Sequence, residues 1–165
     1  MLIDVSYFTA GPRQILNATL GKGTTKENAL IEQYILEYQE EFLHHVLGND
    51  VGETMQAYLV KLDEDPEAEK DPSLEAVCSK IRKAFADYVF FYILRDAGQS
   101  ATITGLVKLK SANAFVEPIV RQVNSWNRMA DRLNAFIEWV DTGECPVDGI
   151  VIDEDLLQPI NRFNL

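Results

Sequence analysis

The most constraining feature of this chain is a long apolar seam in its last third. Between residues 112 and 140, an apolar or small residue recurs at alternating steps of four and three positions. The seam consists of Ala112, Val116, Ile119, Val123, Trp126, Ala130, Leu133, Ile137 and Val140, widened by Phe115, Met129 and Phe136. This spacing keeps side chains on one side of an α-helix. A long helix with one apolar side has to bury it, so we expect a mainly helical chain.

The opposite side of this predicted helix is polar. It carries Glu117, Arg121, Asn124, Arg128, Asp131 and Glu138. Pro118 falls inside the pattern, so the regular helix either begins near Glu117 or bends at the proline. Gly143 and Pro146 are expected to end it.

Length and composition are typical of a single globular domain. The 165 residues, 47% of them hydrophobic, suit one helical domain over residues 1–165. The longest apolar run, residues 88–94, is too short to span a bilayer, and no charged leader with a cleavage site is present. We therefore expect a cytoplasmic protein without a membrane partner. Cys78 and Cys145 are expected to be reduced thiols.

The charge balance narrows the class of partners. The formal net charge is −11, whereas phosphate binding normally requires clustered lysine and arginine. We therefore expect no sequence-specific nucleic-acid binding, and the acidic balance also argues against anionic membranes. An acidic surface is compatible with a position beside DNA, because it does not bind the phosphate backbone.

The first part of the chain is predicted to be an arm, residues 1–25. Within it, residues 1–8 are expected to be extended or irregular, followed by a short helical segment from Gly11-Pro12 through Ala18. Proline suits the first turn of such a segment because its fixed φ fits the helix.

Two helices are expected to follow this arm. Thr24 and Glu27 match a capping box, so the first helix should start there, and Gly48 should end it. Asp50 is expected to cap the second helix. Its buried positions repeat at helical spacing and are Val51, Met55, Tyr58 and Leu62.

Residues 63–71 hold six acids, one lysine and one proline, and are predicted to be an exposed acidic loop. Asp71-Pro72 then starts a helix that reaches about Asp96 and ends at Gly98. Residues 88–94 are apolar on every side of this helix, which indicates that neighbouring helices or a second subunit enclose it.

The remaining segments are an arm and a tail. Residues 100–110 are rich in β-branched side chains and predict a short hairpin or β-arm. Residues 144–165 form a C-terminal tail with a strand-like run at residues 149–152. The predicted fold is a compact bundle of about four to five helices with this hairpin or arm between the last two long helices.

The polar motifs do not assemble into a recognisable catalytic site. His44 and His45 follow Glu40 and Glu41 by one helical turn, which suits either a metal site or an ordinary surface Glu–His pair. Two ligands do not make a site, and Cys78 has no histidine on the neighbouring turns to act as its base. We therefore predict no catalytic residue, no metal site and no cofactor.

Two features suggest contact with another protein. Trp126 lies on the apolar seam and is expected to anchor the core, whereas Trp139 lies off it. Trp139 is either covered by the C-terminal tail or held ready for a partner, because tryptophan is enriched at interface hot spots. The apolar residues of the tail either fold onto their own domain or cross to a neighbour.

The order of these parts resembles head–tail connector (adaptor) proteins of tailed phages and prophages. The likeness covers residues 26–140 and is carried by local strings in the expected order. These strings are residues 42–48 (FLHHVLG), 58–59 (YL), 86–92 (ADYVFFY), 102–107 (TITGLV) and 125–129 (SWNRM), with the acidic loop between the second and third. The extension after Gly143 has no counterpart in the pattern.

The resemblance implies a non-enzymatic virion protein that forms a homo-oligomeric ring beneath the portal and offers a docking surface to tail or neck proteins. It further implies that the two long helices form the subunit core, and that the arm and tails reach across to neighbours. The interface candidates are Phe90, Phe91, Ile103, Leu106, Val107, Trp139, Leu156, Leu157, Ile160 and Phe163. The location implied is the bacterial host cytosol and then the virion.

Two other functions stay open on the sequence. One is a small helical adaptor or regulatory domain outside any virion, which binds one protein through Trp139 and the tail. The other is a metal-dependent enzyme that uses the Glu40, Glu41, His44 and His45 cluster.

Overall fold

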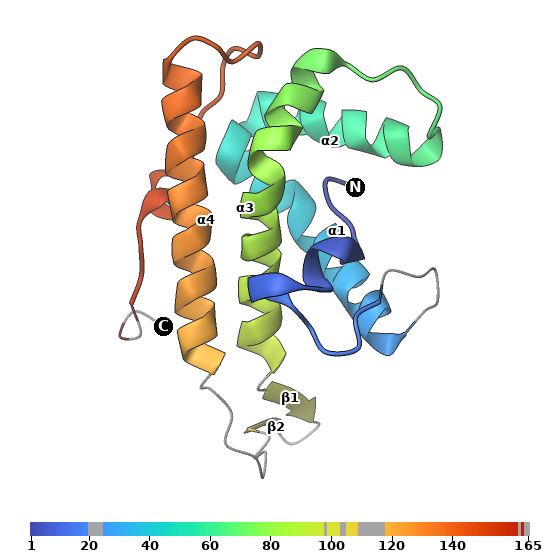
Figure 1. Ribbon diagram of the computed structural model, residues 1–165, viewed down its shortest axis with the longest axis vertical. Coiled ribbons are helices and arrows are strands. Elements are labelled where there is room, and N and C mark those ends of the chain that lie inside the picture. The colour runs from blue at the N-terminus through green and yellow to red at the C-terminus, as the bar shows by residue number, and fades with distance from the viewer. Residues whose placement is uncertain (20–24, 98, 103–104, 109–117, 162, 164–165) are drawn as a thin grey trace.

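The chain folds into a helical bundle, which confirms the predicted fold class. The computed structural model describes residues 1–19, 25–97, 99–102, 105–108, 118–161 and 163. In this part of the chain, the α-helices are α1 (Lys26–Leu47), α2 (Asn49–Glu64), α3 (Pro72–Ala97) and α4 (Pro118–Asp141). Figure 1 shows α3 in the middle, with α4 along one side and the α1–α2 pair on the other.

Helix α3 is the centre of the core. Every residue from 84 to 91 is buried, so the stretch predicted to be enclosed on all sides does lie among several neighbours. From α1, the ring of Phe42 lies 4.9 Å from that of Phe85 and 5.2 Å from that of Tyr88. Cys78 is fully buried on the same helix, and burial raises the pKa of its thiol to about 11. Cys78 therefore packs as an apolar core side chain.

Helix α4 buries one side, but the buried line is shifted from the predicted seam. The fully buried residues are Ser125, Met129, Ala130, Leu133 and Phe136. Seam residues such as Val123, Trp126 and Ile137 are half-buried. The widening residues Met129 and Phe136 are therefore the centre of the contact with α3. The described part of α4 begins at Pro118, and the expected helical residues 112–117 lie outside the described residues.

The corner between α1 and α2 is tighter than predicted. Gly48 ends α1 with a φ of 79°, as expected, and it is also the residue immediately before α2. Helix α2 therefore begins at Asn49, and Asp50 lies in its first turn rather than capping it. At the other end of α1, Thr25 is the capping residue: its side chain accepts a hydrogen bond from the backbone N–H of Asn28. Thr24 lies outside the described residues.

The N-terminus was predicted to be an extended or irregular arm, but residues 1–8 are part of the core. Residues 5–8 form a 3-10 helix, η1 (Val5–Phe8), and Leu2, Ile3, Val5 and Phe8 are buried in the core. The backbone N–H of Leu2 donates to the Oε1 atom of buried Gln39 on α1 at 2.6 Å. The segment belongs to the core because its apolar side chains cover α1 and α3.

The prediction of a short helix from Gly11-Pro12 through Ala18 was also wrong. Only a second 3-10 helix, η2 (Gly11–Arg13), is formed there, and residues 14–19 are non-helical. The first helical turn that proline favours does not propagate, because a short segment needs tertiary packing to stabilise further turns. None of the residues of η2 is buried.

A two-stranded hairpin lies between α3 and α4. Strands β1 (Gln99–Thr102) and β2 (Gly105–Lys108) pair antiparallel, from Gln99 opposite Lys108 to Thr102 opposite Gly105. Figure 1 shows the hairpin at the end of the bundle where α3 ends and α4 begins. Within the described residues, no helix has the length and apolar character needed to cross a bilayer.

Candidate assembly surfaces

The C-terminal tail lies along α4 of its own chain. Asn127 holds it with two bonds: its Nδ2 donates to the carbonyl of Ile160 at 3.0 Å, and its Oδ1 accepts from the N–H of Ile160 at 2.8 Å. About two turns further along α4, Asn134 donates to the carbonyl of Leu157 at 3.1 Å. The polar side of α4 thus satisfies the backbone of an extended segment, much as a neighbouring strand would.

Trp126 joins the tail to the core. Its indole Nε1 donates to the carbonyl of Gln158 at 2.9 Å, and its ring lies 5.1 Å from that of Phe91 on α3. The predicted core anchor is therefore half-buried, with its apolar body on the core and its polar atom on the tail.

The start of the tail covers the end of α1. The N–H of Val151 donates to the carbonyl of Leu47 at 3.2 Å, and the N–H of Asp153 donates to that of His45 at 2.7 Å. These carbonyls belong to the last turn of α1 and have no partner within their helix. The strand-like run at residues 149–152 therefore forms no strand and instead completes a helix end.

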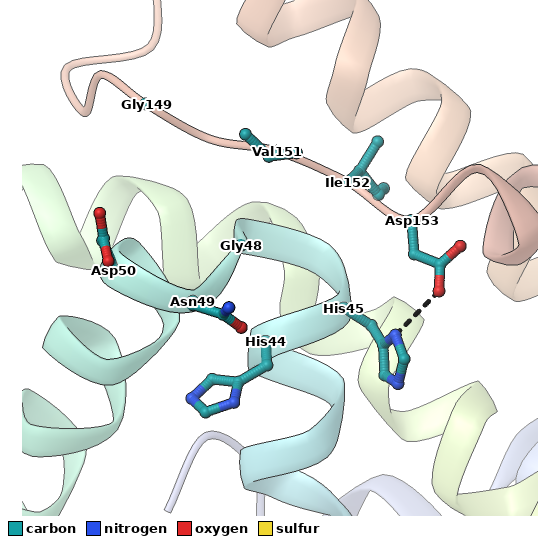
Figure 2. Close-up of a pocket in the computed structure, with 9 residues that line it drawn as sticks. All are labelled: His44, His45, Gly48, Asn49, Asp50, Gly149, Val151, Ile152 and Asp153. Carbon is teal, nitrogen blue, oxygen red and sulfur yellow. Dashed lines mark hydrogen bonds and ion pairs between the residues drawn. The ribbon is translucent and has the colours of Figure 1, made fainter.

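A histidine–carboxylate pair reinforces this contact. Figure 2 shows His45 facing Asp153, and the two side chains are 2.9 Å apart, Nδ1 to Oδ2. Glu41, one turn earlier, lies 4.0 Å from the Nε2 atom of His45. The pair lines a cavity of about 480 Å³ together with Gly48 and Asp50.

The cavity does not gather a set of metal ligands. His44 and His45 point in different directions in Figure 2, as adjacent positions on a helix must. Across the described ranges, no group of three or more His, Cys, Asp or Glu side chains is arranged to hold a metal ion. The buried Nε2 atom of His44 has no hydrogen-bond partner among the described groups.

Three of the predicted interface residues are buried inside their own chain in the described structure. Phe90 is 1% exposed, Phe91 is 6% exposed and Leu156 is 6% exposed. They are apolar as an interface requires, but α3 is enclosed on several sides and the tail folds back onto α4. Sequence pattern cannot distinguish a residue buried by its own chain from one buried by a neighbour.

The other interface candidates fall into three groups. Leu157 and Ile160 are half-buried where the tail meets α4, and Phe163 is 86% exposed. Trp139 is half-buried, with its ring 5.9 Å from that of Phe136 and the Lys80 amine 4.9 Å above it. Leu106 and Val107 lie on β2, whose side chains are not described, and Ile103 lies outside the described residues.

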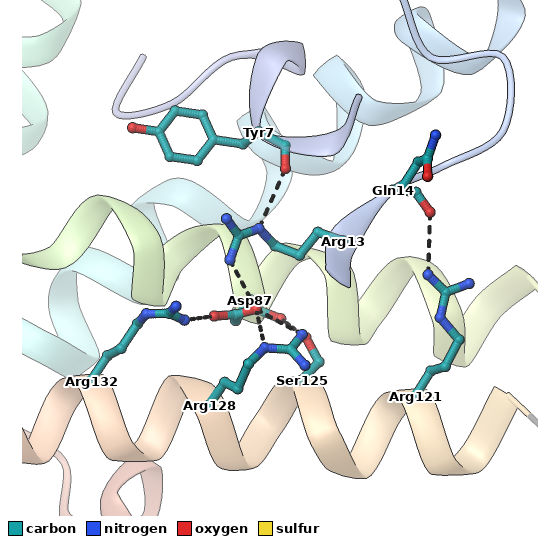
Figure 3. Close-up of polar contacts among 8 residues, drawn as sticks. All are labelled: Tyr7, Arg13, Gln14, Asp87, Arg121, Ser125, Arg128 and Arg132. Atoms are coloured by element: carbon teal, nitrogen blue, oxygen red, sulfur yellow. Dashed lines mark hydrogen bonds and ion pairs between the residues drawn. The ribbon is translucent and has the colours of Figure 1, made fainter. Parts of the chain in front are cut away.

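A buried ion cluster between α3 and α4 was not predicted from the sequence. Asp87 is fully buried, and three arginines converge on its carboxylate (Figure 3). The Nη1 atom of Arg13 lies 3.1 Å from its Oδ1, the Nη2 atom of Arg128 lies 3.0 Å from the same oxygen, and Arg132 pairs with Oδ2. The hydroxyl of Ser125 donates to the backbone carbonyl of Asp87 at 2.8 Å.

This cluster fixes three segments relative to one another. Arg13 comes from η2, Asp87 from α3, and Arg128 and Arg132 from α4. A buried carboxylate needs such partners, because an unpaired charge in a protein interior is strongly unfavourable. Arg128, which was predicted on the polar side of the long helix, therefore contacts the buried carboxylate of Asp87. An aspartate within an otherwise apolar helical stretch, and two arginines one turn apart, were the available signals.

The arginine cluster continues into a basic groove between the same two helices. We use this name for the cavity of about 220 Å³ lined by Lys80, Lys83, Arg132, Ala135 and Phe136. Both lysines are exposed, and neither forms an ion pair within the described part of the chain. The groove and the cluster together contain five cationic side chains and one carboxylate, that of Asp87. This region is therefore basic, although the formal net charge of the chain is −11.

Comparisons with known proteins add no family to this picture. Neither the protein-family models, nor the curated proteins, nor the solved structures contain a match to this chain.

Proposed function

We propose that this chain is a structural subunit of a head–tail connector ring, formed next to the portal of a tailed phage or prophage. It acts through protein–protein contacts rather than catalysis, first in the bacterial host cytosol and then in the virion. The proposal is supported by the resemblance over residues 26–140 together with a helical bundle that has a hairpin at one end.

The hairpin is the single observation that carries the proposal. An isolated two-stranded sheet is marginally stable in water, and its outer edges offer unpaired backbone groups to another strand. Within the described residues, β1 and β2 pair only with each other. A neighbouring subunit that supplies an added strand or a covering surface would stabilise this arm.

The structure also reduces the number of segments available to reach a neighbour. The described tail is held on its own chain by Asn127, Asn134 and the end of α1. In the proposed ring, the arm is therefore the segment that reaches across, while the tail shapes the outer surface of its own subunit.

The experiment is to mix the chain with the portal protein from the same genome and to measure the mass of the product by light scattering. We expect a defined ring on the portal even where the isolated chain is monomeric, because the portal binds and stabilises the assembled form. A chain that stays monomeric at high concentration with the portal present would refute the proposal.

A matched variant isolates the contribution of the arm. Residues 99–108 are replaced by a short glycine–serine linker, which leaves the helices intact. We expect the helical circular dichroism signal and cooperative unfolding to persist while ring formation is lost. A second variant ends after Gly143 and so lacks the C-terminal tail. If this variant still assembles with itself but no longer binds one unrelated partner protein, the adaptor function is favoured instead.

A further inference from the structure

We propose that the basic groove between α3 and α4 receives the acidic segment, residues 63–71, of a second copy of this chain. This contact rests on the proposed ring and adds, beside the arm, a second pair of surfaces that join its subunits. It is a contact between two different surfaces of identical chains.

The groove has free positive charge at its rim. The exposed amine of Lys80 lies 4.9 Å from the ring of Trp139, and Lys83 is exposed beside it. Arg132 on the opposite wall is shared with Asp87, which already has two other arginines. The groove therefore has positive charge in excess of what its own carboxylate neutralises, and an added carboxylate would be attracted there.

The acidic segment has free negative charge. It comprises the end of α2 and the loop before α3, and all six of its acids are exposed. Asp65 and Asp71 accept hydrogen bonds from the nearby backbone, from Glu67 and Ser73 respectively. By contrast, the carboxylates of Glu64, Glu67 and Glu69 form no hydrogen bond or ion pair within the described ranges.

The two surfaces are separate parts of one subunit: the groove is lined by α3 and α4, whereas the acidic segment is the end of α2 and the loop that follows it. Figure 1 shows the outer end of α2 and the following loop on the side of the molecule away from α4. Contact between such surfaces is heterologous: each copy presents its acidic segment to one neighbour and its basic groove to the other. Heterologous contacts generate a ring when the rotation between copies closes.

Charge selects this partner over nucleic acid. A chain of net charge −11 repels a polyanion at long range, and two copies also repel each other. In one orientation the basic groove of one copy faces the acidic segment of the other. The local attraction between these opposite charges then outweighs the long-range repulsion.

The first test is zero-length cross-linking by carbodiimide, which joins an amine only to a carboxylate in contact with it. Equal amounts of ¹⁵N-labelled and unlabelled chain are mixed in the presence of the portal protein, and mixed-isotope products are identified by mass spectrometry. We expect links from Lys80 or Lys83 of one copy to Glu64, Glu67 or Glu69 of the other. Absence of these inter-copy links overturns the inference.

Charge reversal gives a sharper test. One variant carries Lys80→Glu with Lys83→Glu, and another carries Glu67→Lys with Glu69→Lys; all four positions are exposed, so folding should be retained. We expect each variant alone to lose the inter-copy links and ring formation. A mixture of the two variants should regain both, because every groove then meets a segment of opposite charge.

The matched control reverses two exposed lysines outside both surfaces, Lys26→Glu with Lys61→Glu, with the same change in net charge. It should behave as the unaltered chain. Rings that form on the portal equally well from either reversed variant would overturn this contact and leave the connector proposal intact. An unaltered chain that never joins the portal would overturn the connector proposal itself. Binding of duplex DNA by the groove, unchanged in the Glu67→Lys, Glu69→Lys variant, would also overturn the contact.

Discussion

Two ion clusters join distant segments of this molecule, and they differ in burial. Asp87 has a fully buried side chain, whereas Asp153 is 37% exposed and its partner His45 is 43% exposed. The Asp87 cluster joins η2, α3 and α4, and the His45–Asp153 pair joins α1 to the tail. Both clusters are ion pairs, but their contributions to stability should differ. Water solvates the exposed charges of the His45–Asp153 pair, whereas buried Asp87 depends on its arginine partners.

The largest effect is expected from Asp87→Ala. Removal of the buried carboxylate leaves three arginines repelling one another between η2, α3 and α4. The free energy of unfolding, measured by urea denaturation, should fall by about 3–5 kcal/mol. Asp87→Asn keeps the side-chain shape and loses the charge, so it separates packing from charge. A loss below about 1 kcal/mol for both variants would show that burial does not distinguish the two clusters.

A smaller effect is expected from Gly48→Ala, which disturbs the contact between the tail and α1 without removing a charge. Gly48 has φ 79° and ψ 169°, a region that only glycine occupies readily, and an added Cβ would lie 3.2 Å from that of Val151. We expect a loss of about 1–3 kcal/mol in the same assay. Gly143→Ala is the control, because Gly143 has a φ of 74° with nothing within 4 Å of the added atom.

Two tyrosines that are hydrogen-bonded to carboxylates should have an effect on stability between those of the buried and the exposed ion clusters. This effect should be measurable at alkaline pH. Burial, and then the hydrogen bond to Asp96, raises the pKa of Tyr34 to about 12; burial and Glu75 raise that of Tyr58 to about 12. The folded state therefore keeps protons that the unfolded chain releases above pH 10. The resulting stability is fully present below pH 10 and is lost as the pH rises to 12.

The measurement is urea denaturation at several pH values across this window. Tyr34→Phe combined with Tyr58→Phe should flatten the decline in the free energy of unfolding. An unchanged slope in the double variant would assign the alkaline loss to other groups.

The smallest effect is expected from His45→Ala or Asp153→Asn. Both side chains are more than one-third exposed, so solvent screens the pair, and the expected loss is about 0–1 kcal/mol. The backbone bonds of Val151 and Asp153 to α1 stay in place and continue to hold the tail. A loss equal to that of Asp87→Ala would contradict the contrast between exposed and buried clusters.

The elements that were predicted well depend on local chemistry. Gly48 ends α1 through its own positive φ, and Asp71 starts α3 by accepting the N–H of Ser73. The acidic character of residues 63–71 likewise predicted an exposed segment, since charged side chains of one sign repel and stay solvated. Residues 63 and 64 nevertheless belong to α2 rather than to the loop. Such signals are visible in the sequence because the interacting groups lie within a few residues of one another.

The elements that were predicted poorly depend on contacts between distant residues. Leu2, Ile3 and Phe8 have no regular period, so their burial against α1 and α3 had no local signal. Arg128 lies on the polar side of a helical projection, and only the position of Asp87 on α3 brings it to the interior. For the candidate site, the sequence supplied apolar anchors but not the basic groove, which requires α3 and α4 side by side.

The amino-acid order alone determined that this chain is acidic and mainly helical, because composition sets its charge, and periodicity and helix-ending residues act over a few positions. Tertiary structure alone decided which apolar residues face inward, where the tail lies and how three arginines meet one aspartate. The physical reason is that burial and charge pairing depend on separations in space, and those are fixed only when segments far apart along the chain pack together.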